Sequence, residues 1–169
     1  MAADYLISSL PPVSFDAPAP MTVEAFDAKC VEHIGAPALE ALPELAAEWN
    51  DLKTQIMNAI AAERAKARGV DASRWLRPVE GCSIFWRTRA QAAMQEKDPV
   101  KRDAMIDRIL WDAAGELVPA SSPLSAAAAL TYRVRLEIAA RRERISTEEG
   151  NSVFNNLVAA AENAAGTKE

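Results

Sequence analysis

The sequence is poor in the residues that most often carry out catalysis or bind metals. Among 169 residues it has a single histidine and two cysteines, Cys30 and Cys82, which are far apart in the sequence. Without a Cys-x-x-Cys spacing, neither a disulfide framework nor a structural zinc site is expected, and a reducing compartment fits the composition. A lone histidine without a Glu-x-x-His pair also argues against catalytic zinc and di-iron centres. We therefore predict no metal site.

Glycine-rich loops and long apolar segments are missing as well. The six glycines are scattered, so the chain has neither a Walker phosphate loop nor a dinucleotide-binding fingerprint, and we predict no cofactor. No stretch approaches the ~20 consecutive apolar residues of a transmembrane helix. The opening segment carries Asp4, lacks a basic start and is interrupted by Pro11 and Pro12, unlike a signal peptide. These absences lead us to expect a cytoplasmic protein.

The chain is acidic, but its charges are segregated. The formal net charge is −5 and the pI is about 5.1, which does not favour nucleic-acid binding. Residues 1–60 have 2 basic and 9 acidic side chains, whereas residues 61–144 have 16 basic and 11 acidic ones. An acidic front and a basic middle either complement each other within the fold or present two faces to different partners.

Helical periodicity dominates the sequence after residue 20, and no series of strands competes with it. We predict an all-α fold, a multi-helix bundle of about six helices in a single domain. An extended N-terminal strap, residues 1–20, precedes the helical domain, residues 21–169. The predicted helices cover residues 22–34, 43–68, 83–95, 98–118 and 122–145, and a last one starts at residue 146.

Boundary signals mark these helices. The expected starts, as N-caps, first-turn prolines or a capping box, are Thr22, Asp98 with Pro99, Ser122 with Pro123, and Ser146 with Glu149. Gly69 is expected to end the longest helix. Its apolar stripe consists of Leu45, Trp49, Leu52, Ile56 and Ile60. We expect all four tryptophans in the core or at helix contacts: Trp49, Trp75, Trp86 and Trp111.

The opening sequence YLISSLPPVSF motivates the strap. Pro11 and Pro12 remove two backbone donors, and Leu10 before them is pushed towards extended geometry. A disordered tail is the alternative, but such tails are usually poor in large apolar residues. We therefore expect the apolar side chains of this segment to pack against the helical body, namely Tyr5, Leu6, Ile7, Leu10 and Phe15.

Two pairs of residues are candidates for chemistry. Cys30 and His33 share a helix face, but a nucleophilic pair also needs an orienting group and an oxyanion site. The simpler interpretation is that Cys30 packs in the core and His33 occupies the C-terminal end of its helix. Asp103 and Asp107 lie four apart, and their basic neighbours favour a solvated helix face. We predict no catalytic residue.

The most distinctive polar feature is the sequence RVRLEIAARRER in the helix predicted over residues 122–145. Glu137 is positioned to pair with Arg133 and Arg141 four residues away on either side. One interpretation is a solvated face with intrahelical ion pairs. The other is a docking surface for an acidic protein partner, since arginine is enriched at interfaces. The candidate partner-binding residues are Arg133, Arg135, Arg141, Arg142 and Arg144.

Four segments, in this order, carry a resemblance that spans nearly the whole chain. They are YLISSLPPVSFDAPAPMTVEAF, LAAEWNDLKTQIMNAIAAERAKARG, DPVKRDAMIDRILWDAAGEL and LTYRVRLEIAARRERISTEEGNSVFNNLV. Together they resemble an uncharacterised bacterial family that is encoded among the genes of bacterial V/A-type ATPases. The opening, with tyrosine, apolar residues, serine, leucine and proline, is the most specific mark of this resemblance.

The resemblance implies a non-enzymatic accessory or coupling subunit of a V/A-type ATPase. Its role would be like that of the helical socket in these machines, which couples the central rotor stalk to the membrane ring. Its partners would be ATPase subunits at the cytoplasmic face of the membrane, without nucleic acid and without a membrane span. Two alternatives remain at this point. One is a cytosolic helical adaptor that binds another acidic protein, and the other is an enzyme that uses Cys30 and His33.

Overall fold

The computed structural model describes residues 2–34, 36–145, 152–153 and 155–158. Throughout this part of the chain the regular structure is helical and no strand occurs, which confirms the predicted all-α bundle. The helices are α1 (Ala2–Ser9), α2 (Val23–His33), α3 (Ala36–Arg68), α4 (Ile84–Met94), α5 (Pro99–Glu116) and α6 (Ala126–Arg144), with one short 3₁₀ turn, η1 (Ser73–Trp75).

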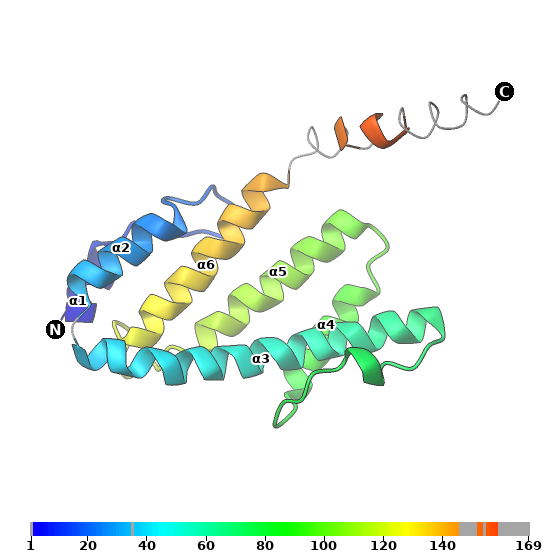
Figure 1. Ribbon diagram of the computed structural model, residues 1–169, viewed down its shortest axis with the longest axis horizontal. Coiled ribbons are helices and arrows are strands. Elements are labelled where there is room, and N and C mark those ends of the chain that lie inside the picture. Colours follow the sequence, from blue (N-terminus) through cyan, green and yellow to red (C-terminus); the bar gives the residue numbers. More distant parts are fainter. Residues whose placement is uncertain (1, 35, 146–151, 154, 159–169) are drawn as a thin grey trace.

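The long helix α3 organises the molecule. It packs against α4, α5 and α6, which follow one another side by side, and α1 and α2 pack against α6 (Figure 1). With 33 residues, α3 spans roughly 50 Å at 1.5 Å per residue. Helix α6 therefore lies between two groups of helices, and its side chains meet neighbours on more than one side.

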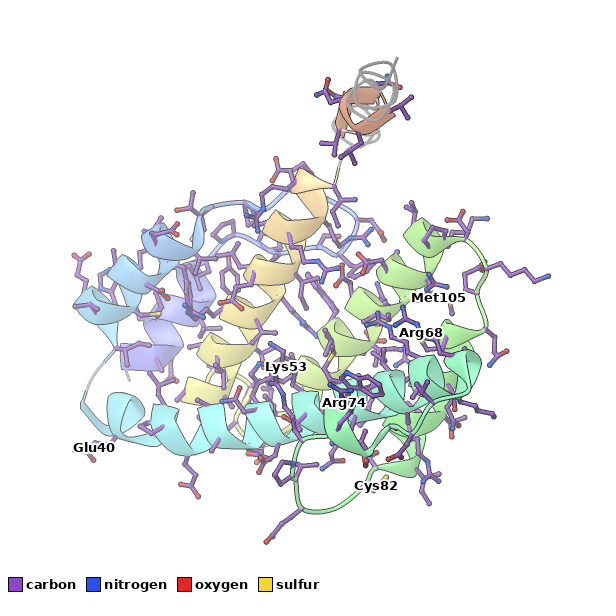
Figure 2. All side chains as sticks on the ribbon, turned by 45° about the vertical axis from the view of Figure 1, so that its right-hand side comes forward. Glu40, Lys53, Arg68, Arg74, Cys82 and Met105 are labelled. Carbon is purple, nitrogen blue, oxygen red and sulfur yellow. The ribbon has the colours of Figure 1, made fainter. Side chains whose placement is uncertain are left out.

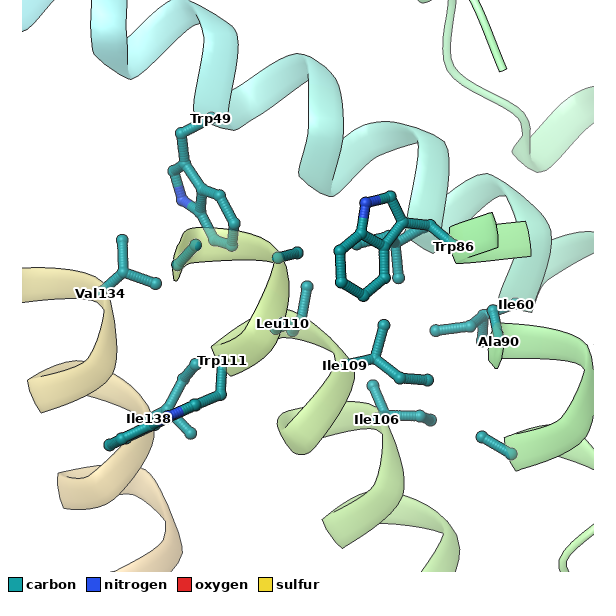
Figure 3. Packing of buried hydrophobic residues seen from close by; sticks show 14 of the residues in the cluster. Trp49, Ile60, Trp86, Ala90, Ile106, Ile109, Leu110, Trp111, Val134 and Ile138 are labelled. Carbon is teal, nitrogen blue, oxygen red and sulfur yellow. The ribbon is translucent and has the colours of Figure 1, made fainter. Parts of the chain in front are cut away.

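Two hydrophobic clusters share α6. The larger one joins α3, α4, α5 and α6 and contains three tryptophans at the contacts between these helices (Figure 3), namely Trp49, Trp86 and Trp111. The smaller one joins α1, α2 and α6 through Leu6, Phe26 and Leu136. Val13, in the connection between α1 and α2, packs against both clusters. This connection therefore links the two halves of the core.

Several predicted boundaries are confirmed. Thr22 caps α2 by accepting a hydrogen bond from the Ala25 amide, and the Asp98 carboxylate caps α5 by accepting from Val100. Helix α3 ends at Gly69, whose φ of +66° is left-handed. There the Gly69 and Val70 amides donate to the carbonyls of Lys66 and Ala65. This is a Schellman ending, which leaves those terminal carbonyls satisfied.

Two helix starts differ from the prediction. Helix α3 begins at Ala36 and includes Pro43 in its interior, because good helix formers on both sides outweigh the one backbone donor that proline lacks. Helix α6 begins at Ala126 rather than near Ser122. The Ser122 amide instead donates to the Pro119 carbonyl at 2.9 Å, which commits these residues to a turn.

The prediction of an extended strap over residues 1–20 is wrong for its first half. Residues 2–9 form α1, and Leu6 is buried, whereas Tyr5 is exposed. Proline restricts only its own residue and the one before it, so Pro11 and Pro12 end this helix without preventing it. Residues 10–22 are non-helical, and Phe15 contacts Trp111 edge to face with 5.5 Å between ring centroids.

The C-terminal prediction falls largely outside the described residues. The capping box at Ser146 and Glu149 is among the residues that the structure does not describe. In the described positions beyond α6, Val153, Leu157 and Val158 are exposed. No helix in the described part of the chain has the length and apolarity needed to cross a membrane.

Candidate functional site

The arginines predicted to form a docking surface occupy the last three turns of α6, where the packing of this helix decides what each can do. Arg133 makes a two-pronged contact with α2, donating from Nε and Nη2 to the two carboxylate oxygens of Asp27 at 2.9 and 3.2 Å. It also pairs with Glu137, as predicted from their spacing. These hydrogen bonds raise the pKa of Arg133, and they fasten α6 to α2.

Arg135 lies in the interface between α6 and α5. Its guanidinium stacks over the Trp111 ring at 5.1 Å, and its Nε donates to the Trp111 carbonyl at 3.4 Å. A Cβ atom at Gly115 would approach its Nη2 to 2.6 Å, so the absence of a side chain there makes room for the guanidinium. Burial lowers the pKa of Arg135. This arginine is a packing residue of the helix interface.

Arg141 covers a carboxylate that the sequence placed on a solvated face. It pairs with Asp103 and with Asp107, whose Oδ1 lies 3.4 Å from Nη1. Asp107 is 1% exposed, and neither of its carboxylate oxygens makes a hydrogen bond within the described chain. The prediction of a solvated carboxylate pair is therefore wrong for Asp107, because the approach of α6 buries a position that the spacing within α5 cannot distinguish from its neighbour. Burial raises the pKa of Asp107.

The last two arginines differ from each other. Arg142 lies over the Phe15 ring at 4.0 Å and within 3.9 Å of the Asp16 carboxylate, so it holds the connection between α1 and α2 against α6. Arg144 is exposed, and none of its contacts within the described residues is an ion pair. Four of the five arginines thus have partners in the same chain. Docking through this helix stays a prediction, and Arg141 and Arg144 have the most exposed side chains to serve it.

The Cys30 and His33 pair lacks the features of an activated nucleophile. Burial, with a smaller contribution from the Asp27 carboxylate, raises the pKa of the Cys30 thiol to about 11. A thiol with that pKa is protonated at neutral pH, whereas catalytic cysteines have a lowered pKa. His33 instead meets the Tyr5 ring edge to face, with 5.9 Å between centroids, and lies 3.7 Å from Glu32.

Acidic and sulfur-containing side chains do not gather into a metal centre in the described residues. No group of three or more histidine, cysteine, aspartate or glutamate side chains there has the arrangement to hold an ion. Asp103 and Asp107 instead line a cleft of about 300 Å³ between α3, α5 and α6, together with Lys53 and Arg64 of the long helix. The cleft carries both signs of charge, so it favours neither an anion nor a cation.

Sequence reasoning missed an exposed aromatic residue. Trp75 was expected in the core or at a helix contact, but it lies in η1 and is 49% exposed, unlike the three buried tryptophans. Arg74 stacks over its ring at 5.1 Å. The available signal was its position in an irregular, basic segment between Gly69 and Pro78, where no helix exists to bury it.

Comparison with models of protein families, with curated proteins and with solved structures gives no match to this chain.

Proposed function

We propose that this protein is a non-enzymatic, helical accessory or coupling subunit of a bacterial V/A-type ATPase, with a role like that of the socket between the central rotor stalk and the membrane ring. The observation that carries the proposal is the ordered set of four sequence segments that resembles the family encoded with these ATPases. The protein would act at the cytoplasmic face of the membrane, held there by ATPase subunits.

The packing of those segments supports the proposal. The opening segment and the α6 segment carry the most specific parts of the resemblance, and they are in direct contact. The Tyr132 hydroxyl donates to the Pro11 carbonyl at 3.0 Å, and its ring stacks on Phe26 with 5.1 Å between centroids. A sequence pattern shared by segments 121 residues apart is expected when both contribute to one packed interface.

Affinity purification tests this function. The full chain, tagged at its C-terminus because its N-terminal helix is packed into the core, is expressed in the bacterium that encodes it. We expect ATPase subunits to co-purify from detergent-solubilised membranes. A preparation from which the tagged protein is recovered but ATPase subunits are absent would contradict the ATPase assignment.

The second candidate is a cytosolic adaptor that binds another acidic protein. The observation that favours it is the group of arginines around Trp75, which have no ion-pair partner among the described residues. The same purification separates the two candidates, because an adaptor would bring down an acidic protein from the soluble fraction and no ATPase subunit from the membranes.

A further inference from the structure

A groove at the end of α3 has the composition of a protein-docking site. It measures about 330 Å³ and lies between the last two turns of α3 and the segment that turns back after Gly69. Its lining residues are Ala61, Arg64, Ala65, Arg68, Val70 and Trp75. The alanines and Val70 give an apolar surface, Trp75 forms an aromatic wall, and the two arginines stand one helical turn apart.

The basic side chains around this groove are not used inside the molecule. Residues 61–77 contain five basic and two acidic side chains. The acidic ones are engaged locally, since Glu63 accepts from Gln91 and Asp71 accepts from Ser73. Arg64, Arg68 and Arg74 have no ion-pair partner in the part of the chain that the structure describes. Because the Schellman ending satisfies the terminal carbonyls, these arginines are not needed to cap α3 either.

The segment that carries Trp75 is held in place. Asn58 of α3 exchanges two hydrogen bonds with the Arg77 backbone, at 2.8 and 2.9 Å. Gln55 likewise donates to the Glu80 carbonyl and accepts from the Ser83 amide. The segment therefore runs back along α3, and Arg74 lies near Arg68 in Figure 2. A held surface binds more tightly because less conformational entropy is lost on binding.

We propose that this groove, named here the Trp75 groove, binds an acidic segment of a partner protein that inserts an aliphatic side chain between its carboxylates. Exposed tryptophan and arginine are the residue types most enriched at binding hot spots. The unpaired arginines supply the charge complementarity, and the apolar lining takes the aliphatic side chain. The inference rests on the proposed function only for the identity of the partner, since the groove would serve an ATPase subunit or another acidic protein equally.

Single-stranded nucleic acid is the other ligand class that uses tryptophan and arginine together. Two observations favour the protein segment. The Arg74 guanidinium covers one face of the Trp75 ring, which a base would need for stacking. The chain as a whole has a net charge of −5, which opposes binding of a long polyanion at moderate salt.

Fluorescence titration of the full chain tests the proposal with two labelled synthetic peptides. One contains glutamate, alanine and leucine, and the matched peptide has lysine in place of glutamate. We expect the acidic peptide alone to bind, with an affinity that falls as salt is added. The emission of exposed Trp75 should change on binding, and this change should be lost in Trp75→Ala.

Matched variants separate the groove from general charge. The double variant Arg64→Glu with Arg68→Glu should weaken binding of the acidic peptide by about tenfold or more, because it replaces attraction with repulsion. The control, Lys97→Glu with Lys101→Glu, makes the same change in net charge at positions outside the groove and should have little effect. Phe85→Ala, at another exposed aromatic residue beside an arginine, is the control for Trp75→Ala.

Several outcomes would overturn the inference. They are absence of acidic-peptide binding to the wild-type chain, equal binding by the groove and control variants, or tighter binding of a single-stranded oligonucleotide than of the acidic peptide. The result is distinguishable from the test of the ATPase assignment. If ATPase subunits co-purify equally with the wild type and with the Arg64/Arg68 variant, and the peptide binds both equally, the groove is refuted and the ATPase assignment stands.

Discussion

Helix α6 and the end of α3 both carry closely spaced arginines, but the two regions differ in what surrounds them. On α6, Arg133 meets Asp27, Arg135 meets Trp111 and Arg142 meets Phe15, all within the same chain. At the end of α3, Arg64 and Arg68 border a groove and have no ion-pair partner among the described residues. The comparison teaches that a basic stripe becomes part of the fold or a docking surface according to which helices pack against it.

The largest expected effect comes from removing the segment that anchors the α6 arginines. Deletion of residues 1–20 removes buried Leu6 and the partly buried Phe15 that lies under Arg142. At ~1.5–3 kcal/mol for each large apolar side chain, the loss takes up much of a typical folding stability of ~5–15 kcal/mol. Urea denaturation followed by circular dichroism measures it.

Two point variants make the same test without truncation. Leu6→Ala should cost ~2–5 kcal/mol because it leaves a cavity in the smaller cluster. Tyr5→Ala, at the exposed neighbouring position, should leave the unfolding midpoint nearly unchanged. A truncated chain that unfolds at the wild-type urea concentration would contradict the packing of the N-terminal segment.

The second prediction compares the two arginine regions directly. Arg135→Glu should lower the free energy of unfolding by about 2–4 kcal/mol, because it replaces the stacking on Trp111 with a partly buried, unpaired carboxylate. Arg68→Glu should change it by less than about 0.5 kcal/mol, as exposed substitutions do. Thermal melting of both variants under one buffer condition gives the answer. Equal destabilisation by the two substitutions would remove the distinction between the regions.

This comparison also shows what the sequence could not reveal. The charge pattern of α6 predicted the Arg133–Glu137 pair correctly, because both residues belong to one helix. It could not show that Arg135 stacks on Trp111 or that Arg141 covers Asp107, since these contacts join α6 to α5 across the bundle. A glutamate reversal of Arg135, which the sequence suggested would be harmless, is for that reason expected to be costly.

Local signals predicted the fold better than the candidate site. The N-caps Thr22 and Asp98 and the ending at Gly69 are all confirmed, because each depends on residues within a few positions. Helix α1 was missed because the two prolines were given an influence over residues that precede their reach. Trp75 was missed because its exposure depends on hydrogen bonds from Gln55 and Asn58, which hold its segment against α3.

The third prediction concerns the buried carboxylate under Arg141. Burial raises the folded-state pKa of Asp107 above the value of 3.8 that applies without burial, while Arg141 and Arg142 lower it and Asp103 raises it. The folded chain thus holds this proton more tightly than the unfolded chain. The contribution of Asp107 to stability therefore falls as the pH rises from about 4 through its raised pKa, and it is constant above that.

Asp107→Asn removes this titration. Relative to the wild type, the variant should gain stability as the pH rises over that window, which urea denaturation at several pH values measures. Asp112→Asn is the control, because Asp112 is a more exposed carboxylate of the same helix that pairs with Arg89. A stability difference between wild type and Asp107→Asn that does not vary with pH would show that Asp107 has an ordinary pKa.

The smallest expected effect uses Cys30 as a reporter of the ion pair between α6 and α2. The Asp27 carboxylate raises the pKa of the Cys30 thiol and the Arg133 guanidinium lowers it. Asp27→Asn should therefore speed the reaction of Cys30 with a thiol reagent at pH 8 severalfold, and Arg133→Gln should slow it, because the thiolate is the reacting form. The measurement uses a Cys82→Ser background, since Cys82 is exposed. Loss of the ion pair by either substitution would loosen the interface similarly, so opposite changes in rate report charge, whereas faster reaction in both variants would show that the pair acts only by holding α6 against α2.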